Sequence, residues 1–339
     1  MIRLKDIAKE LDLSISVVSK VINNSKGTAV VSPATTKRIR ETAQRMGYLC
    51  NRTAVALRSG SQQAIGLLLH PMGAAGSEMT EDLLKGAAQE MSAHEQRMEL
   101  VFYQNKAEFM KQMRRMGPTR VDGLIVAGLD HDYLNPALRE LAQEGVPIVT
   151  ILSEPVSSAI PNVGCGDMEG SRLATEHLIE QGCERIAQIG KWDLRLQGYV
   201  QALRAHGRTP DDSLIYQTDR STFTAQVGEE GVAAFVARGV QYDGLVCQCD
   251  IYAMGAMRAL ARLGRSIPNQ VKVIGFDNAP ICEHLAEPLS SVSLELRDRA
   301  RRAVLAMIRL QHGGSIDSIQ VPPRVVHRAS SRLVRSSVK

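Results

Sequence analysis

Residues 4–23 read Leu-Lys-Asp-Ile-Ala-Lys-Glu-Leu-Asp-Leu-Ser-Ile-Ser-Val-Val-Ser-Lys-Val-Ile-Asn. The first half has apolar residues at the spacing of one helix face, at Leu4, Ile7, Ala8 and Leu11. The second half has a matching apolar edge, at Val18, Val21 and Ile22. Ser14, which lies between them, is a good N-cap for the second helix. The stretch predicts a helix-turn-helix, and the alternative from these residues alone is a small helical hairpin within another kind of domain.

The remaining face of the second helix carries side chains suited to DNA. Ile15 and Ser16 stand at its start and Lys20 follows one turn later, where side chains reach base edges in the major groove. Lys20 can donate to guanine acceptors and Ile15 can contact a thymine methyl group, although an isolated surface apolar residue is the alternative for Ile15. Three further side chains are better placed for phosphates, namely Ser14, Ser19 and Asn23.

A third helix is expected to close this bundle. Ser32 places a capping side chain directly before Pro33, and Gly47 ends the helix. Its inward residues are Ile39, Ala43 and Met46. The helix-competent segment 51–58 that follows is too small to bury its own apolar edge, formed by Ala54 and Leu57.

Positive charge is concentrated in this first part of the chain. Residues 1–60 contain eleven Lys or Arg and four Asp or Glu, a net charge of +7. The whole chain of 339 residues carries +5, so the remainder is at −2. A localised positive excess on a helix-turn-helix favours double-stranded DNA as the partner.

From about residue 63 the chain alternates apolar strands with amphipathic helices, which is typical of an α/β fold with parallel sheets covered on both faces. The expected strands are 64–69, 98–103, 123–127, 147–152, 185–190, 243–247 and 271–276. A Pro- and Ser-containing stretch near residue 160 separates two β-α series, which predicts two Rossmann-like lobes. A second crossing is expected at 288–293, followed by a helix at about 295–311 in the first lobe and a strand at about 319–327 in the second. Such lobes bind ligands in the cleft at the carboxyl ends of strands.

Ordered short motifs run from about Leu4 to Arg332. In the head they are Lys5-Asp6-Ile7-Ala8, Leu13-Ser14, Val18 to Asn23, Val31-Ser32-Pro33, Gly47-Tyr48-Leu49-Cys50-Asn51 and Ala54 to Leu57. In the core they are Gly164-x-x-Asp167-x-x-Gly170, Ala174-x-x-His177-Leu178-Ile179, Arg195-x-x-Gly198-Tyr199, Asp250-x-x-Ala253-x-Gly255, Gly275-Phe276-Asp277-Asn278 and Pro288-Leu289. This ordered set resembles the LacI/GalR family of bacterial transcription regulators.

The resemblance implies three parts. They are a helix-turn-helix DNA-binding domain at 1–49, a hinge helix or linker at 50–62, and an effector-binding and dimerisation core of periplasmic-binding-protein type at 63–335. Within the core, lobe 1 is expected at about 63–160 and 291–316, and lobe 2 at about 161–290 and 317–335.

The resemblance also implies roles for single residues. In the hinge helix, which begins at Asn51, Leu57 would wedge into the minor groove of a palindromic operator with Ala54 beside it. Arg195 and Asp277 match effector-contacting positions, and their donors and acceptors suit the hydroxyls of a sugar or related polyol. The other candidates for the effector site are Trp192, Phe276, Tyr252 and Cys249. Because one head makes few DNA contacts, a homodimer is expected.

The chain departs from the family pattern at positions that determine which ligand and which operator are bound. In the core, Leu152 replaces a common aspartate, Met168 and Cys249 replace asparagines, and the loop before Arg195 is short. In the head, Lys20 replaces an arginine, Val17 a threonine and Asp12 a glycine, and the loop at 25–30 is longer. These changes leave open a less hydroxylated effector, or none.

The sequence gives little support to an enzyme, a cofactor-binding protein or a metal-binding protein. The run at 164–170 nearly matches the dinucleotide-binding glycine pattern, but its third glycine comes one residue late. His177 is a lone helical histidine, and neither a P-loop nor a Gly-x-Ser-x-Gly turn occurs. The six cysteines lack paired metal spacing, so reduced thiols are expected. We therefore expect no catalysis, cofactor or metal.

The absence of a membrane-length apolar run and of a signal peptide predicts a cytoplasmic protein without membrane contact. The sequence as a whole predicts a dimeric repressor on a palindromic operator, switched by a carbohydrate-like small molecule. One alternative is the same DNA-binding role without a small-molecule effector, either constitutive or controlled by a protein partner. More distant alternatives are a sugar-binding protein without DNA function and an enzyme.

Overall fold

The computed structural model describes residues 2–23, 31–48, 60–73, 78–116, 120–128, 133–190, 193–218 and 223–332. They form two compact units, which divide between Gln63 and Ala64. Four residues predicted to have a role lie outside the described residues, namely Asn51, Ala54, Leu57 and Trp192.

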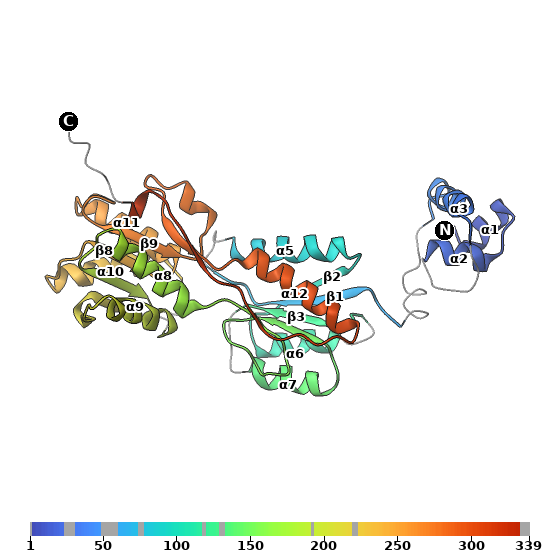
Figure 1. Ribbon diagram of the computed structural model, residues 1–339, viewed down its shortest axis with the longest axis horizontal. Helices are drawn as coiled ribbons and strands as arrows, with labels where there is room; N and C mark the ends of the chain where they lie inside the picture. Colours follow the sequence, from blue (N-terminus) through green and yellow to red (C-terminus); the bar gives the residue numbers. More distant parts are fainter. Residues whose placement is uncertain are drawn as a thin grey trace. The chain divides into compact units, whose positions relative to one another are not determined.

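The first unit is a bundle of three helices, α1 (Leu4–Leu11), α2 (Ile15–Ile22) and α3 (Pro33–Arg45) (Figure 1). Its core confirms the predicted apolar edges and consists of Ile7, Ala8, Val18, Val21, Ile39 and Ala43. Ser14 Oγ accepts a hydrogen bond from the Val17 N–H at 3.3 Å, and Ser32 Oγ accepts one from the Thr35 N–H at 3.1 Å. The bundle is therefore a capped helix-turn-helix closed by a third helix.

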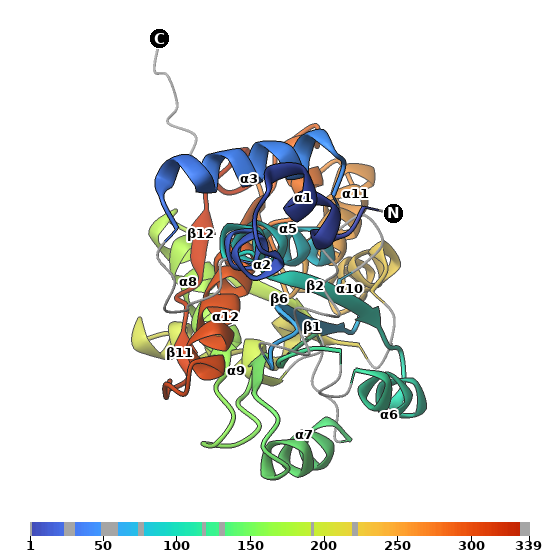
Figure 2. The same ribbon diagram turned by 90° about the vertical axis from the view of Figure 1, so that its right-hand side faces the viewer.

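The second unit contains two sheets, and the first has the strand order β2-β1-β3-β4. These parallel strands are β1 (Ala64–Leu69), β2 (Arg97–Phe102), β3 (Leu124–Ala127) and β4 (Ile148–Ile151). One face packs against α5 (Met79–Ala93) and α12 (Leu296–Gln311), and the other against α6 (Lys106–Arg115) and α7 (Leu134–Gln143). Figure 2 shows α6 and α7 on the side of this sheet opposite to α5.

The second sheet has the order β12-β10-β9-β8-β6-β7. Its strands are β6 (Ile186–Gly190), β7 (Ile215–Gln217), β8 (Gly244–Cys247), β9 (Lys272–Phe276), β10 (Ser290–Ser293) and the antiparallel edge strand β12 (Arg324–Val326). The helices that cover its two faces are α8 (Asp167–Glu180) with α9 (Asp193–Ala205), and α10 (Ala225–Ala237) with α11 (Asp250–Arg262). Short 3-10 turns are η1 (Asp212–Leu214), η2 (Pro280–Glu283) and η3 (Ala329–Ser331).

Three segments connect the lobes. The chain leaves the first sheet through β5 (Val163–Gly164), returns after β10, and leaves again through β11 (Ile319–Gln320), which pairs with β5. Because β10 belongs to the second sheet, the return comes after Ser293 rather than near residue 291. The expected strand at 319–327 is two short strands, since Pro322 and Pro323 between them have no N–H to donate. No helix among the described residues has the length and apolar character needed to cross a bilayer.

Candidate functional site

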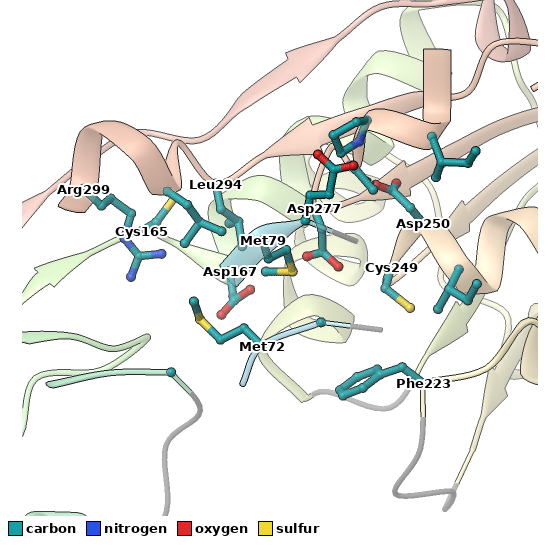
Figure 3. A pocket seen from close by; sticks show the side chains of 18 of the residues that line it. Met72, Met79, Cys165, Asp167, Phe223, Cys249, Asp250, Asp277, Leu294 and Arg299 are labelled. Carbon is teal, nitrogen blue, oxygen red and sulfur yellow. Dashed lines mark hydrogen bonds between the residues drawn. The ribbon is translucent and has the colours of Figure 1, made fainter. Parts of the chain in front are cut away.

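A cavity of about 380 Å³ lies between the two lobes of the second unit, beside the carboxyl ends of the strands. Lobe 1 contributes Met79 of α5 and Ile151 of β4, and lobe 2 contributes Cys249 and Asp277, which follow β8 and β9. Figure 3 shows the side chains that border this space. Its volume lies within the usual range for small-molecule sites.

Arg195, in the first turn of α9, is buried and bonded from several sides. Its Nε donates to Asp167 Oδ1 at 2.7 Å, and its Nη1 donates to the carbonyl oxygen of Gln248 and lies 3.6 Å from Asp277 Oδ1. Its guanidinium lies over the ring of Phe276, 3.7 Å from the ring centre. Protein groups therefore fix this cation in place.

Asp277 lies at the end of β9 in an uncommon backbone conformation. Its φ is +102°, and the φ of the next residue, Asn278, is +53°; such conformations are uncommon for residues other than glycine and gather at functional sites. Burial raises the pKa of Asp277 to about 8; Arg195 opposes this rise, and the charges of Asp250 and Asp167 add to it. The carboxyl group is thus held where its charge is costly.

Asp250 at the start of α11 is a second buried carboxyl group, but its oxygens are occupied. Oδ1 accepts from Ser291 Oγ at 2.6 Å and Oδ2 from the Ala279 N–H at 2.7 Å. Burial raises its pKa to about 6. Asp250 therefore ties α11 to β10 and to the turn after β9, and so positions the cavity wall.

The structure places three of the predicted effector residues in the cavity lining, namely Arg195, Asp277 and Cys249. Phe276 and Tyr252 do not border the cavity, which corrects their expected place in its wall. Phe276 supports the guanidinium of Arg195, and the fully buried ring of Tyr252 stacks on Phe223 with centres 6.5 Å apart. Sequence periodicity predicts that such an aromatic side chain points inward. It does not predict whether the ring borders the cavity or lies behind the residues that do.

The two departures at Leu152 and Met168 do not shape the cavity directly. Leu152 packs in the core of lobe 1, and its backbone N–H donates to Asn162 Oδ1 at 3.0 Å. Met168 is 40% exposed and lies outside the lining. The atypical character of the site therefore comes from other residues.

Sequence reasoning missed most of the apolar lining and several of its charged residues. The apolar residues include Met72, Met79, Phe223, Met254 and Leu294. Arg299 of α12 also borders the cavity, where its Nε donates to the Val163 carbonyl at 3.0 Å and its Nη2 to the Leu152 carbonyl at 3.2 Å. These residues come from separate segments of the chain. The only signal in the sequence was Arg299, a charged residue on the face of α12 that is otherwise apolar and points inward.

The start of α2 presents the predicted DNA-reading side chains. Ser14, Ile15 and Ser16 are exposed, with Ile15 at 53%, and Lys20 and Asn23 are half-buried. Ser19 is only 7% exposed and accepts a hydrogen bond from Asn23 Nδ2 at 3.0 Å. The expected phosphate contact of the Ser19 side chain is therefore corrected, since this side chain packs within the bundle and positions Asn23.

Within the described residues, no group of three or more His, Cys, Asp or Glu side chains could hold a metal ion. The five cysteines of that part of the chain are buried and form no disulfide, namely Cys165, Cys183, Cys247, Cys249 and Cys282. Burial raises the pKa of the Cys249 thiol well above its ordinary value. The thiol in the cavity wall is thus neutral and weakly reactive.

Comparisons with known proteins match both units. Residues 3–51 match the family described as bacterial regulatory proteins, lacI family, and residues 175–331 match a periplasmic binding protein-like domain. The HTH-type transcriptional regulator RegA of Clostridium saccharobutylicum is 27% identical over 328 residues, which cover 93% of this chain and 94% of RegA.

Two solved structures have similar folds. A lac repressor dimer bound to operator and the anti-inducer ONPF superposes with a TM-score of 0.80 at 20% identity, covering 98% of this chain and 99% of that one. A complex of the transcriptional regulator CelR with cellobiose gives 0.68 at 24% identity, covering 97% of this chain and 100% of that one. These likenesses support the two-lobed fold that follows a helix-turn-helix.

Proposed function

We propose that this chain is a transcriptional repressor of the LacI family, which binds a palindromic operator as a homodimer and responds to a small molecule. The match of residues 3–51 to bacterial regulatory proteins of the lacI family and of residues 175–331 to a periplasmic binding protein-like domain supports this proposal. One observation carries this proposal. A single chain combines a helix-turn-helix, whose second helix begins with exposed Ile15 and Ser16, with a two-lobed unit that contains a cavity. Such a regulator works on the chromosome, in the cytoplasm.

The proposed DNA contacts follow from the exposed start of α2. Ile15, Ser16 and Lys20 read base edges in the major groove, and Ser14 and Asn23 contact phosphates. The resemblance supports a second set of contacts in the minor groove, made by the hinge residues Asn51, Ala54 and Leu57.

The proposed switch uses the cavity, whose lining comes from both lobes. A molecule that contacts both lobes favours one lobe arrangement over another, and operator affinity then changes by the ligand's differential binding to the two states. A DNA-binding protein without a small-molecule effector is the alternative, and the cavity favours the switched form.

Retardation of genomic DNA fragments by the full-length protein tests the DNA-binding role. We expect a small set of retained fragments that share a palindrome, with affinity that falls steeply as salt rises. Lys20→Ala should weaken the preferred fragment about tenfold or more and relax its base preference. The matched control is Lys37→Ala, which removes an equally charged but highly exposed side chain from α3 and should leave base preference unchanged. Equal affinity for all fragments would contradict the proposal.

A further inference from the structure

We propose that the molecule bound in the cavity is an organic cation with an apolar body, whose ammonium group lies against the carboxyl groups of Asp167 and Asp277. This inference rests on the proposed function, because it names the chemical class of ligand for the same cavity. The proposed class of ligand differs from a sugar, a sugar acid or a phosphate.

The lining of the cavity contains more acidic than basic groups. Among the described residues the cavity is bordered by four carboxyl groups and two guanidinium groups, namely Glu78, Asp167, Asp250 and Asp277 against Arg195 and Arg299. Charges interact more strongly in a partly enclosed site than in water. Even without Asp277, whose pKa is raised to about 8 by burial, three carboxyl groups stand against two guanidinium groups, and this excess of acid favours a ligand that brings positive charge.

Both guanidinium groups in the lining are bonded to other groups of the protein. Arg195 binds Asp167 and the Gln248 carbonyl and lies over Phe276. Arg299 donates to two backbone carbonyls, those of Val163 and Leu152. An anionic ligand would have to compete for these donors and would also meet Asp167 and Asp277, so a sugar acid or phosphate is disfavoured.

Asp167 and Asp277 are the carboxyl groups of the lining that suit an ammonium group best. Asp250 has both oxygens bonded to protein donors, whereas the side chains of Asp167 and Asp277 remain 15% and 11% exposed. Figure 3 shows these two residues around the same space as Met79. Both side chains border the cavity beside Arg195, so an ammonium group placed against them can donate to their carboxyl oxygens.

The remaining wall of the cavity is mainly apolar. Thioether, aromatic and branched side chains dominate it, namely Met72, Met79, Phe223, Ile251, Met254 and Leu294. Methionine adapts to apolar and aromatic groups, and an aromatic face attracts cations. A ligand with hydroxyl groups on every side would place several of them against this wall without partners.

An inorganic cation satisfies the charge argument but not the geometry. Over the residues that the structure describes, no cluster of three or more ligating side chains is arranged around a point that a metal ion could occupy. An ammonium needs hydrogen-bond acceptors on one side only, which the two aspartates supply. The structure therefore assigns the cavity to an organic cation.

Thermal shift and calorimetry on the full-length protein test this assignment with matched compounds. The pairs are cyclohexylamine with cyclohexanol, phenethylamine with phenethyl alcohol, and glucosamine with glucose, with gluconate as the anion. We expect saturable stabilisation by the amine of at least one pair, with its neutral partner binding about tenfold more weakly or worse. Asp277→Asn and, separately, Asp167→Asn should each lower affinity for that amine about tenfold. Asp298→Asn on the outer side of α12, where Asp298 binds Arg301 and Arg302, is the control and should not.

Two results would overturn the inference. One is stabilisation by glucose, gluconate or the alcohols that equals or exceeds that of the amines. The other is the lack of stabilisation by every amine. Retardation of DNA by the same preparation is measured in parallel, so that loss of the proposed regulatory function shows as lost DNA binding and is separate from either result.

Discussion

The buried guanidinium of Arg195 depends on two neighbouring carboxyl groups for its stability, those of Asp167 and Asp277. Arg195 is 8% exposed, and its guanidinium is balanced by Asp167 at 2.7 Å and Asp277 at 3.6 Å. Removing one member of a buried charged group leaves the others unpaired, which costs more than the group contributes as a whole. Arg195 therefore matters for folding as well as for the cavity.

We predict that Arg195→Met lowers the free energy of unfolding by about 3 kcal/mol near neutral pH, because the Asp167 carboxyl group loses its hydrogen-bonded cation. Arg258→Met is the control, since Arg258 pairs with Glu229 at the surface and its side chain is 55% exposed. Urea unfolding of both variants measures the difference, and equal stabilities would contradict the prediction.

The caps of the head helices act at the scale of the element. Ser14 caps α2 and Ser32 caps α3 through the same type of hydrogen bond. We predict that Ser14→Ala and Ser32→Ala each destabilise their helix by about 1 kcal/mol, measured by amide hydrogen exchange in the full-length protein. Only Ser14→Ala should also weaken operator binding beyond this effect, because Ser14 lies next to the proposed reading residues. Equal DNA affinity of the two variants would count against the role of α2.

Two glycines set the closeness of α10 and α11. A Cβ atom at Gly228 would overlap the carbonyl oxygen of Tyr252, and one at Gly255 would overlap that of Ala225. We predict that Gly255→Ala costs about 2 kcal/mol of stability, because neither backbone oxygen can move without shifting a helix. Since α11 also carries cavity residues, ligand affinity should fall with it. Ala233→Ser on the exposed side of α10 is the control, with an expected change under about 0.5 kcal/mol in thermal unfolding.

The elements also show how far sequence reasoning reaches. The seven strands predicted from apolar runs all occur, with ends that agree within one residue, and all except the edge strand β2 are almost wholly buried. The strands β5, β7 and β11 have only two or three residues, too few for any periodicity, and they form where the sheets bring partners to them. In the cavity, Arg195, Asp277 and Cys249 followed from motifs, whereas Met79, Phe223 and Arg299 are brought together only by the crossing of the lobes.

At the scale of the whole molecule, buried titratable groups make stability depend on pH in opposite directions. Burial raises the pKa of Asp277 to about 8, so the folded protein holds a proton there that the unfolded chain releases near pH 4. Stability from this group is therefore lost as pH rises toward and through about 8. Burial lowers the pKa of His177 to about 4, next to His327, so its contribution is lost as pH falls from about 6.5 toward 4.

Above about pH 6.5, of these two groups only Asp277 still titrates differently in the folded and unfolded states. We predict that unfolding free energy falls between about pH 6.5 and 8.5, with a slope of up to roughly 1.4 kcal/mol per pH unit, and that Asp277→Asn flattens this fall. Asp298→Asn, whose carboxylate lies at the surface, should keep the wild-type slope. Parallel curves for Asp277→Asn and wild type would contradict the prediction. A bound ammonium group stabilises the ionised form of Asp277. A saturating amine should therefore flatten the dependence of the wild-type unfolding free energy on pH, as Asp277→Asn does. This result would link the pH dependence of folding to the chemistry of the cavity.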